Sequence, residues 1–171
     1  MKPIFVKTWI VFALMAVLWL GADLVGRIYN EKEKAEQMYF AAQGIQSFSR
    51  LSGAKPPPFY PSDSDISTAV DYMNRLVDAG CMQGGDLNLL SGYPYTYWYP
   101  APFSSNSIAF TIYRVSADDP PSTILMVSRN DIFKWCQVVI RKDGTGGVYP
   151  IWKKLEAIGT LPQGRPMTLA P

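Results

Sequence analysis

The chain has 171 residues and a formal net charge of +2, so it lacks the global basic field that holds nucleic acid. It contains no histidine, which excludes Ser-His-Asp and Cys-His catalysis and histidine-based metal ligation. No phosphate-binding loop, nucleophile elbow or redox CxxC motif is present. We therefore predict no enzymatic activity, no catalytic residue, no cofactor and no metal site. The alternative is an enzyme that uses acidic residues alone, which would need two facing carboxylates in a cleft.

The chain opens with a long apolar segment, PIFVKTWIVFALMAVLWLGADLVG, at positions 3–26. No charged residue lies between Lys7 and Asp23, and the apolar side chains point in all directions around a helix. With its flanking residues, the segment reaches the roughly 20 residues that a bilayer requires. Lys2 and Lys7 precede most of it, which predicts a cytoplasmic N-terminus and a remainder of the chain outside.

A cleaved signal peptide would share this basic start and apolar centre, with a candidate cleavage site after Ala22. The helical pattern continues beyond that site, however. Apolar residues recur there at steps of three and four: Ile28, Ala35, Met38, Ala42, Ile45 and Phe48. We therefore expect one helix over residues 4–51, ended by Gly53 and the KPPPFYP segment. The predicted organisation is a transmembrane segment over 1–26, an amphipathic stem helix over 27–53 and an extracytoplasmic head over 54–171.

The head is predicted to contain one helix and several antiparallel strands. The segment at 64–80 has a helical apolar face, with Ser64, Asp65 or Ser67 as the N-cap. The segments at 107–116, 123–129, 135–142 and 148–152 read as strands, followed by a short helix at 153–158 and a loose tail after Leu161. Because an isolated hairpin is marginally stable, we expect the strands to cover the amphipathic stem, which defines an α+β fold.

The densest aromatic cluster is a candidate partner-binding patch. No Lys or Arg lies between Arg75 and Arg114, so nucleic acid is not the expected partner. Aromatic side chains dominate protein interfaces, and a glycan or protein could bind here. The alternative is that the rings simply cover the sheet. The patch consists of Tyr93, Tyr95, Tyr97, Trp98 and Tyr99.

The two cysteines, Cys81 and Cys136, are too few to form a zinc cluster without other ligands. They form one disulfide bond or remain two buried thiols, and their spacing does not decide between these alternatives. Lys7 and Asp23 similarly either pair with the span of another subunit or mark the two membrane boundaries.

Three segments resemble the type IV pilin-like proteins, and more closely the type II secretion pseudopilins. They are the stem end with its following loop, AEQMYFAAQGIQSFSRLSGAKPPPFYP, the helix DYMNRLVDAGCM and the turn and strand DDPPSTILMVSRN. The resemblance implies a pilin-like fold and a filament in which the stems pack together. The residues expected to make this membrane and stem packing are Trp9, Ile10, Leu14, Val17, Leu18 and Val25.

The sequence departs from the family at its processing site. The family has a glycine before Phe-Thr-Leu-Ile-Glu, whereas here Ile4 precedes Phe5 and Trp9 stands at the position of the glutamate. Both the prepilin cleavage motif and its glutamate are therefore absent. A diverged relative that stays anchored and helps assembly fits this pattern.

The sequence thus predicts a non-enzymatic, membrane-anchored pilin-like subunit or assembly component of a type IV pilus or type II secretion pseudopilus. The expected location is the bacterial inner membrane, crossed once, with the head periplasmic or extracellular. The expected partners are membrane lipid and other pilin-like subunits or secretion-machinery proteins, in a homo- or hetero-oligomer. The alternative is a bitopic or secreted module that recognises a protein or glycan through its aromatic patch.

Overall fold

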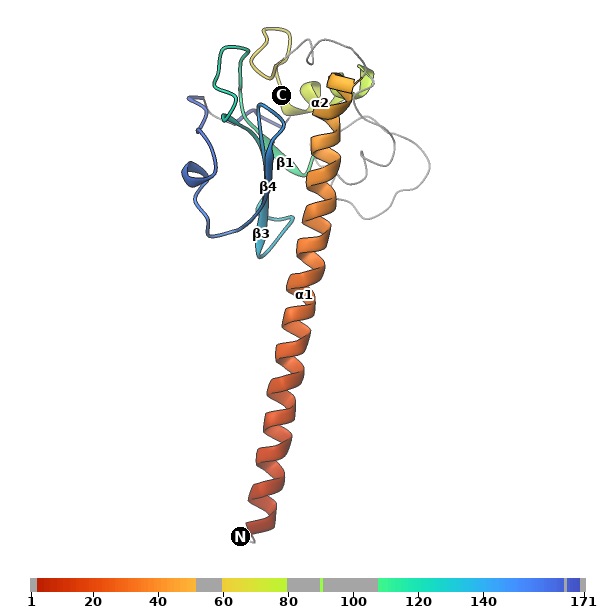
Figure 1. The fold of residues 1–171 in the computed structure, drawn as a ribbon, viewed down its shortest axis with the longest axis vertical. Helices are drawn as coiled ribbons and strands as arrows, with labels where there is room; N and C mark the ends of the chain where they lie inside the picture. The colour runs from red at the N-terminus through yellow and green to blue at the C-terminus, as the bar shows by residue number, and fades with distance from the viewer. Residues whose placement is uncertain (1–2, 52–59, 80–89, 91–107, 165, 170–171) are drawn as a thin grey trace.

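One long helix, α1 (Pro3–Leu51), runs through the molecule and carries the rest of the described chain beside its C-terminal half (Figure 1). The computed structural model describes residues 3–51, 60–79, 90, 108–164 and 166–169, without the side chains of 3–8 and 44–51. The helix predicted over residues 4–51 is therefore confirmed. Within the described part of the chain, α1 is the one helix long and apolar enough to cross a membrane.

The sequence of α1 explains why it forms without a break. No proline follows Pro3 within the helix, and the polar segment after residue 26 is rich in the strong helix formers Glu, Lys and Ala. Two ion pairs at a spacing of four residues join successive turns: Asp23 with Arg27 at 2.8 Å and Lys32 with Glu36 at 3.6 Å. Both pairs are exposed, so each adds little to the stability of the helix.

The sheet of the head is an antiparallel meander in the order β1-β2-β3-β4. Its strands are β1 (Phe110–Ile112), β2 (Ile124–Ser128), β3 (Cys136–Arg141) and β4 (Gly146–Pro150). The register pairs Thr111 with Val127, Val127 with Val139, and Val139 with Gly147. Three of the strands fall within the predicted segments, whereas β4 spans 146–150 rather than the predicted 148–152. The α+β fold class is confirmed: a long apolar helix and an antiparallel sheet.

The sheet lies along one side of α1, where β3 and β4 contact the helix (Figure 1). The helix contributes small side chains to this contact, because Ala35, Ala41 and Ala42 are buried together with Met38. Small residues allow the sheet to approach the helix backbone closely, and the larger side chains of the strands fill the core. The sheet supplies Phe110, Ile112, Met126, Val138 and Ile140. The amphipathic part of the stem is therefore the surface that the strands cover, as predicted.

The second helix, α2 (Ala69–Asp78), is shorter than the predicted segment and begins at a different cap. Thr68, not Ser64, Asp65 or Ser67, is the N-cap: its Oγ1 accepts the Asp71 N–H at 3.1 Å. The Asp71 carboxylate in turn accepts the Thr68 N–H at 3.0 Å. This reciprocal capping box satisfies two backbone donors at the start of the helix, which explains why α2 starts there.

Two further predictions are corrected at the C-terminal end. The short helix is a single 3₁₀ turn over Leu155–Ala157 rather than a helix over 153–158. The tail after Leu161 is docked, not loose: Met167 is buried and its N–H donates to the Ile112 carbonyl at 2.8 Å. Tyr113 also forms a β-bridge with Pro166, so the tail covers the outer edge of β1.

Candidate membrane and helix-packing surface

The N-terminal half of α1 exposes a continuous apolar surface. All six residues predicted to pack in the membrane or stem bundle are exposed, from 54% for Ile10 to 72% for Trp9 and Leu18. The others are Leu14, Val17 and Val25. A helix that is apolar on every side requires lipid or protein around it, because water solvates it poorly. The structure places these residues where a membrane or neighbouring helices would cover them.

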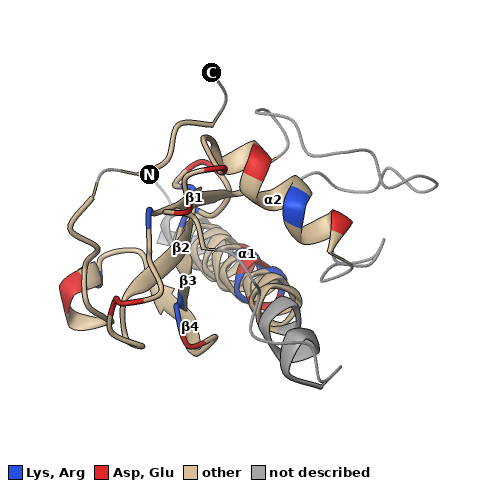
Figure 2. Ribbon diagram, turned by 90° about the horizontal axis from the view of Figure 1, so that it is seen from above, with Lys and Arg blue, Asp and Glu red and all other residues tan. Residues whose placement is uncertain are grey.

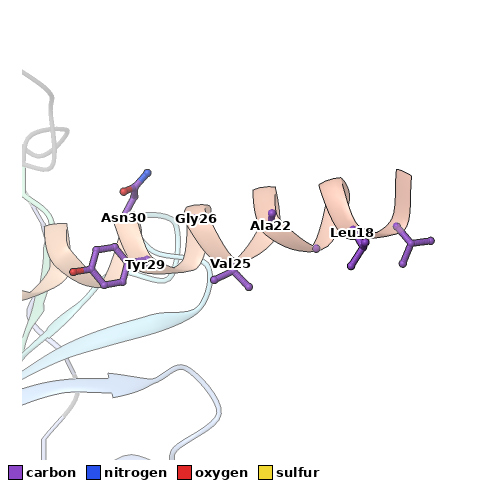
Figure 3. A pocket seen from close by; sticks show the side chains of 8 residues that line it. Leu18, Ala22, Val25, Gly26, Tyr29 and Asn30 are labelled. Carbon is purple, nitrogen blue, oxygen red and sulfur yellow. The ribbon is translucent and has the colours of Figure 1, made fainter. Parts of the chain in front are cut away.

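One face of this bare helix carries an open groove (Figure 3). Its floor is formed by small residues, and a Cβ added at Gly21 or Gly26 meets no atom within 4 Å. Small residues on a membrane helix let a second helix approach closely, which is the usual basis of helix association in lipid. The groove is lined by Val17, Leu18, Gly21, Ala22, Val25, Gly26, Tyr29 and Asn30.

The bare helix joins the head through the carboxylate of Glu31. Its Oε1 accepts the backbone N–H of Trp135 at 2.5 Å and that of Cys136 at 3.3 Å. The thiol of Cys136 lies 3.7 Å from the same oxygen. A carboxylate that accepts backbone N–H groups makes charge-assisted hydrogen bonds, which are stronger than neutral ones. Glu31 therefore fixes the beginning of β3 against one turn of α1.

Cys136 is buried beside this carboxylate and carries a free thiol. Burial, with the negative charge of Glu31 and the hydrogen bond to it, raises the pKa of the Cys136 thiol to about 12. A thiol in this state is inert at neutral pH, because the thiolate is the reactive form. Cys81, the other cysteine of the alternatives raised by the sequence, lies outside the described residues.

The predicted aromatic patch also lies outside the described residues, namely Tyr93, Tyr95, Tyr97, Trp98 and Tyr99. In the described part of the head, acidic and basic residues are interspersed (Figure 2). Asp119 accepts the backbone N–H of Ser116 at 2.6 Å, and Asp143 accepts that of Thr145 at 2.9 Å. These two carboxylates stabilise turns.

Sequence reasoning did not single out Glu31. The residue stands in the mixed-charge string EKEKAE, where each charge is equally compatible with a solvated helix face. Only the tertiary structure brings the backbone of Trp135 to it, from 104 positions along the chain. Apolar periodicity, which identifies the stem helix, carries no information on such a contact.

These features define the class of the protein as an α+β head built around the end of one long apolar helix. No protein-family model, no curated protein and no solved structure matches the chain.

Proposed function

We propose that this chain is a non-enzymatic, membrane-anchored pilin-like subunit, or an assembly component, of a type IV pilus or type II secretion pseudopilus. The observation that carries the proposal is the division of α1. Its N-terminal half is bare and apolar, whereas its C-terminal half is buried in the core of the head. This division supports a subunit whose exposed helix is covered first by lipid and then by neighbouring helices.

The chemistry of such a subunit is helix packing. In the bilayer, lipid covers Trp9 to Val25, and the exposed Asp23 and Arg27 neutralise one another at the membrane boundary. In an assembly, the groove at Gly21 and Gly26 would receive a ridge of a neighbouring helix. The proposed orientation is a single crossing of the bacterial inner membrane, with the N-terminus cytoplasmic and the head periplasmic or extracellular.

Fractionation of native cells tests this proposal. Sheared filaments, inner membranes and the soluble fraction are separated, and the intact mass of the protein is measured in each. Full-length protein in filaments supports a subunit, and full-length protein confined to carbonate-resistant membranes supports an assembly component. A soluble form that lacks the apolar segment would overturn the anchored function.

An exchange of the anchor separates the proposal from the binding-module alternative. Residues 1–26 are replaced by the transmembrane helix of an unrelated bitopic protein. A subunit that works through its stem loses filament incorporation or assembly activity, because the groove is no longer present. A module that works through Tyr93, Tyr95, Tyr97, Trp98 and Tyr99 keeps its function on any anchor, and that result would contradict our proposal.

A further inference from the structure

The end of the head nearest to the bare helix is formed by two chain segments that lie side by side. Trp135 and Cys136 are held to Glu31, and Cys136 pairs with Pro150 in the register of β3 and β4. The Ile151 N–H donates to the Trp135 carbonyl at 3.0 Å, so the chain after β4 continues along this end. Figure 1 shows the bare part of α1 projecting from the same end of the head.

These two segments carry tryptophan and lysine side chains, which we call the Trp-Lys patch. Trp152 is 74% exposed, although large apolar side chains are otherwise buried in most of the head. Lys134 places its ammonium 5.2 Å from the centre of the Trp135 ring. Glu156, two residues after Lys154 in the chain, and Glu33 on α1 are exposed acids, while Asp131 is paired with Arg129 at 2.6 Å. The patch consists of Lys134, Trp135, Trp152, Lys153 and Lys154.

The position of the patch along α1 sets its height above a membrane. Glu31 follows Gly26, the end of the apolar segment, by five residues, which is about 7–8 Å along a helix. The headgroup layer on each side of a bilayer is roughly 5–7 Å thick, and long side chains extend beyond the backbone that carries them. The Trp-Lys patch therefore stands at the level of the lipid headgroups when the apolar segment spans the hydrocarbon core.

We propose that the head rests on the outer leaflet of the membrane that α1 crosses, with the Trp-Lys patch bound to anionic lipid headgroups. Tryptophan prefers the membrane–water interface. Each lysine near an anionic membrane surface raises the affinity for that surface by about fivefold. This inference rests on the anchoring part of the proposed function but not on filament assembly. It explains why an exposed tryptophan and three lysines gather at the one end of the head that faces the membrane.

The first test locates Trp152 in full-length protein reconstituted in nanodiscs that contain phosphatidylglycerol. The emission of Trp152 is obtained as the difference between the wild type and Trp152→Phe. We expect a phosphatidylcholine with a spin-labelled headgroup to quench it and aqueous iodide to leave it largely unchanged. The matched control adds Leu161→Trp to Trp152→Phe. Leu161 is exposed beside Thr160, which bonds to Ser122 before β2, at the far end of the sheet.

The second test removes the positive charges of Lys153 and Lys154. Lys153→Gln with Lys154→Gln should lower the ratio of docked to undocked heads by about fivefold per lysine in anionic discs. The loss should be absent in discs of phosphatidylcholine alone. Lys142→Gln removes one positive charge away from the patch and is the control for the effect of each single lysine, because Lys142 bonds to the carbonyl groups of Ala117 and Asp119 at the far end of β3.

The outcomes separate this inference from the proposed function. A chain that inserts into the discs but leaves Trp152 open to iodide overturns the inference alone. Equal quenching of Trp152 and the Leu161→Trp reporter would overturn it as well. A chain that does not insert overturns both the docking and the anchoring, whereas lipid quenching of Trp152 that depends on Lys153 and Lys154 supports the docked head.

Discussion

Glu31 and Trp135 are 104 residues apart in the chain and are joined by a hydrogen bond of 2.5 Å from the Trp135 N–H to the Glu31 carboxylate. The same oxygen accepts the N–H of Cys136. One side chain therefore accepts hydrogen bonds from two backbone donors at the beginning of β3. The attachment of the head to the helix combines this polar contact with the apolar contact made by Ala35 and Met38.

We predict that Glu31→Ala destabilises the head relative to the helix. The substitution leaves two partly buried N–H groups without their acceptor, which costs about 1–3 kcal/mol. Thermal unfolding of the full chain in mild detergent measures the effect as a lower Tm. Glu33→Ala is the matched control, because Glu33 is exposed on the same helix and its loss should cost less than about 0.5 kcal/mol. Equal Tm values for the two variants would contradict the role of Glu31.

The raised pKa of Cys136 predicts a loss of stability at alkaline pH. Burial and Glu31 raise the pKa of this thiol from its ordinary value of 9.0 to about 12 in the folded chain. The protonated thiol thus contributes its full stabilisation of the folded chain below pH 9. This stabilisation is lost as the pH rises toward 12, because the unfolded chain releases the proton more readily.

Unfolding of the wild type and of Cys136→Ala over this pH range measures the contribution. Burial also raises the pKa of Tyr113, so only the difference between the two proteins reports on the thiol. We expect the wild type to lose stability more steeply than Cys136→Ala. Parallel curves would show that the thiol does not titrate as the structure implies.

Gly146 and Gly147 are neighbours in β4, but we expect substitution by alanine to have very different effects at the two positions. A Cβ at Gly146, where φ is +156°, would lie 1.9 Å from the backbone carbonyl oxygen of Val139. A Cβ at Gly147 meets the Tyr149 ring at 3.6 Å, which is ordinary contact. We therefore expect Gly146→Ala to disrupt the β3–β4 hairpin and to cost more than about 2 kcal/mol, whereas Gly147→Ala stays within about 1 kcal/mol. Comparison of the two Tm values tests this, and a tolerated Gly146→Ala would contradict the register of β3 and β4.

Because α1 carries a groove on one face, we predict that a large side chain placed in the groove abolishes helix association. Gly21→Leu fills the groove and should prevent copies of the protein, or its partner subunits, from crosslinking in membranes. Ala16→Leu adds apolar bulk away from the groove, since Ala16 lies nine residues, or two and a half turns, before Val25. That variant should crosslink like the wild type, and an equal loss in both variants would argue against a groove-specific contact.

The sequence predicts the helices and strands well where the apolar pattern is regular. The steps of three and four residues from Ile28 to Ala42 identify the stem helix, and alternation in residues such as Phe110 and Ile112 identifies strands. Contacts that depend on single polar groups are not predictable in this way. Ser64, Asp65, Ser67 and Thr68 are all good caps by residue type. Thr68 is the cap in the structure, where Asp71 completes its capping box and the Thr168 carbonyl accepts the Ala69 N–H at 2.9 Å.

The candidate site likewise has one part that can be predicted from the sequence and one part that depends on the tertiary structure. The exposed apolar residues of α1 follow from composition, because a helix with no charge between Lys7 and Asp23 has no polar face. The end of the head that carries Trp152 does not follow from composition, since it depends on the register that places Pro150 beside Cys136. Met167 was likewise missed, because a lone apolar residue in a segment rich in Pro and Gly gives no periodic signal.

The unbroken α1 joins the apolar segment to the described part of the head as one continuous helix. Some 28 residues, or about 42 Å of helix, lie beyond Asp23. A transmembrane helix is tilted by about 20° on average, and a tilt of that size would displace the C-terminal end of α1 sideways by about 14 Å. The lipid around the first half of the helix, or a neighbouring helix in its groove, would thereby set the direction in which the head faces.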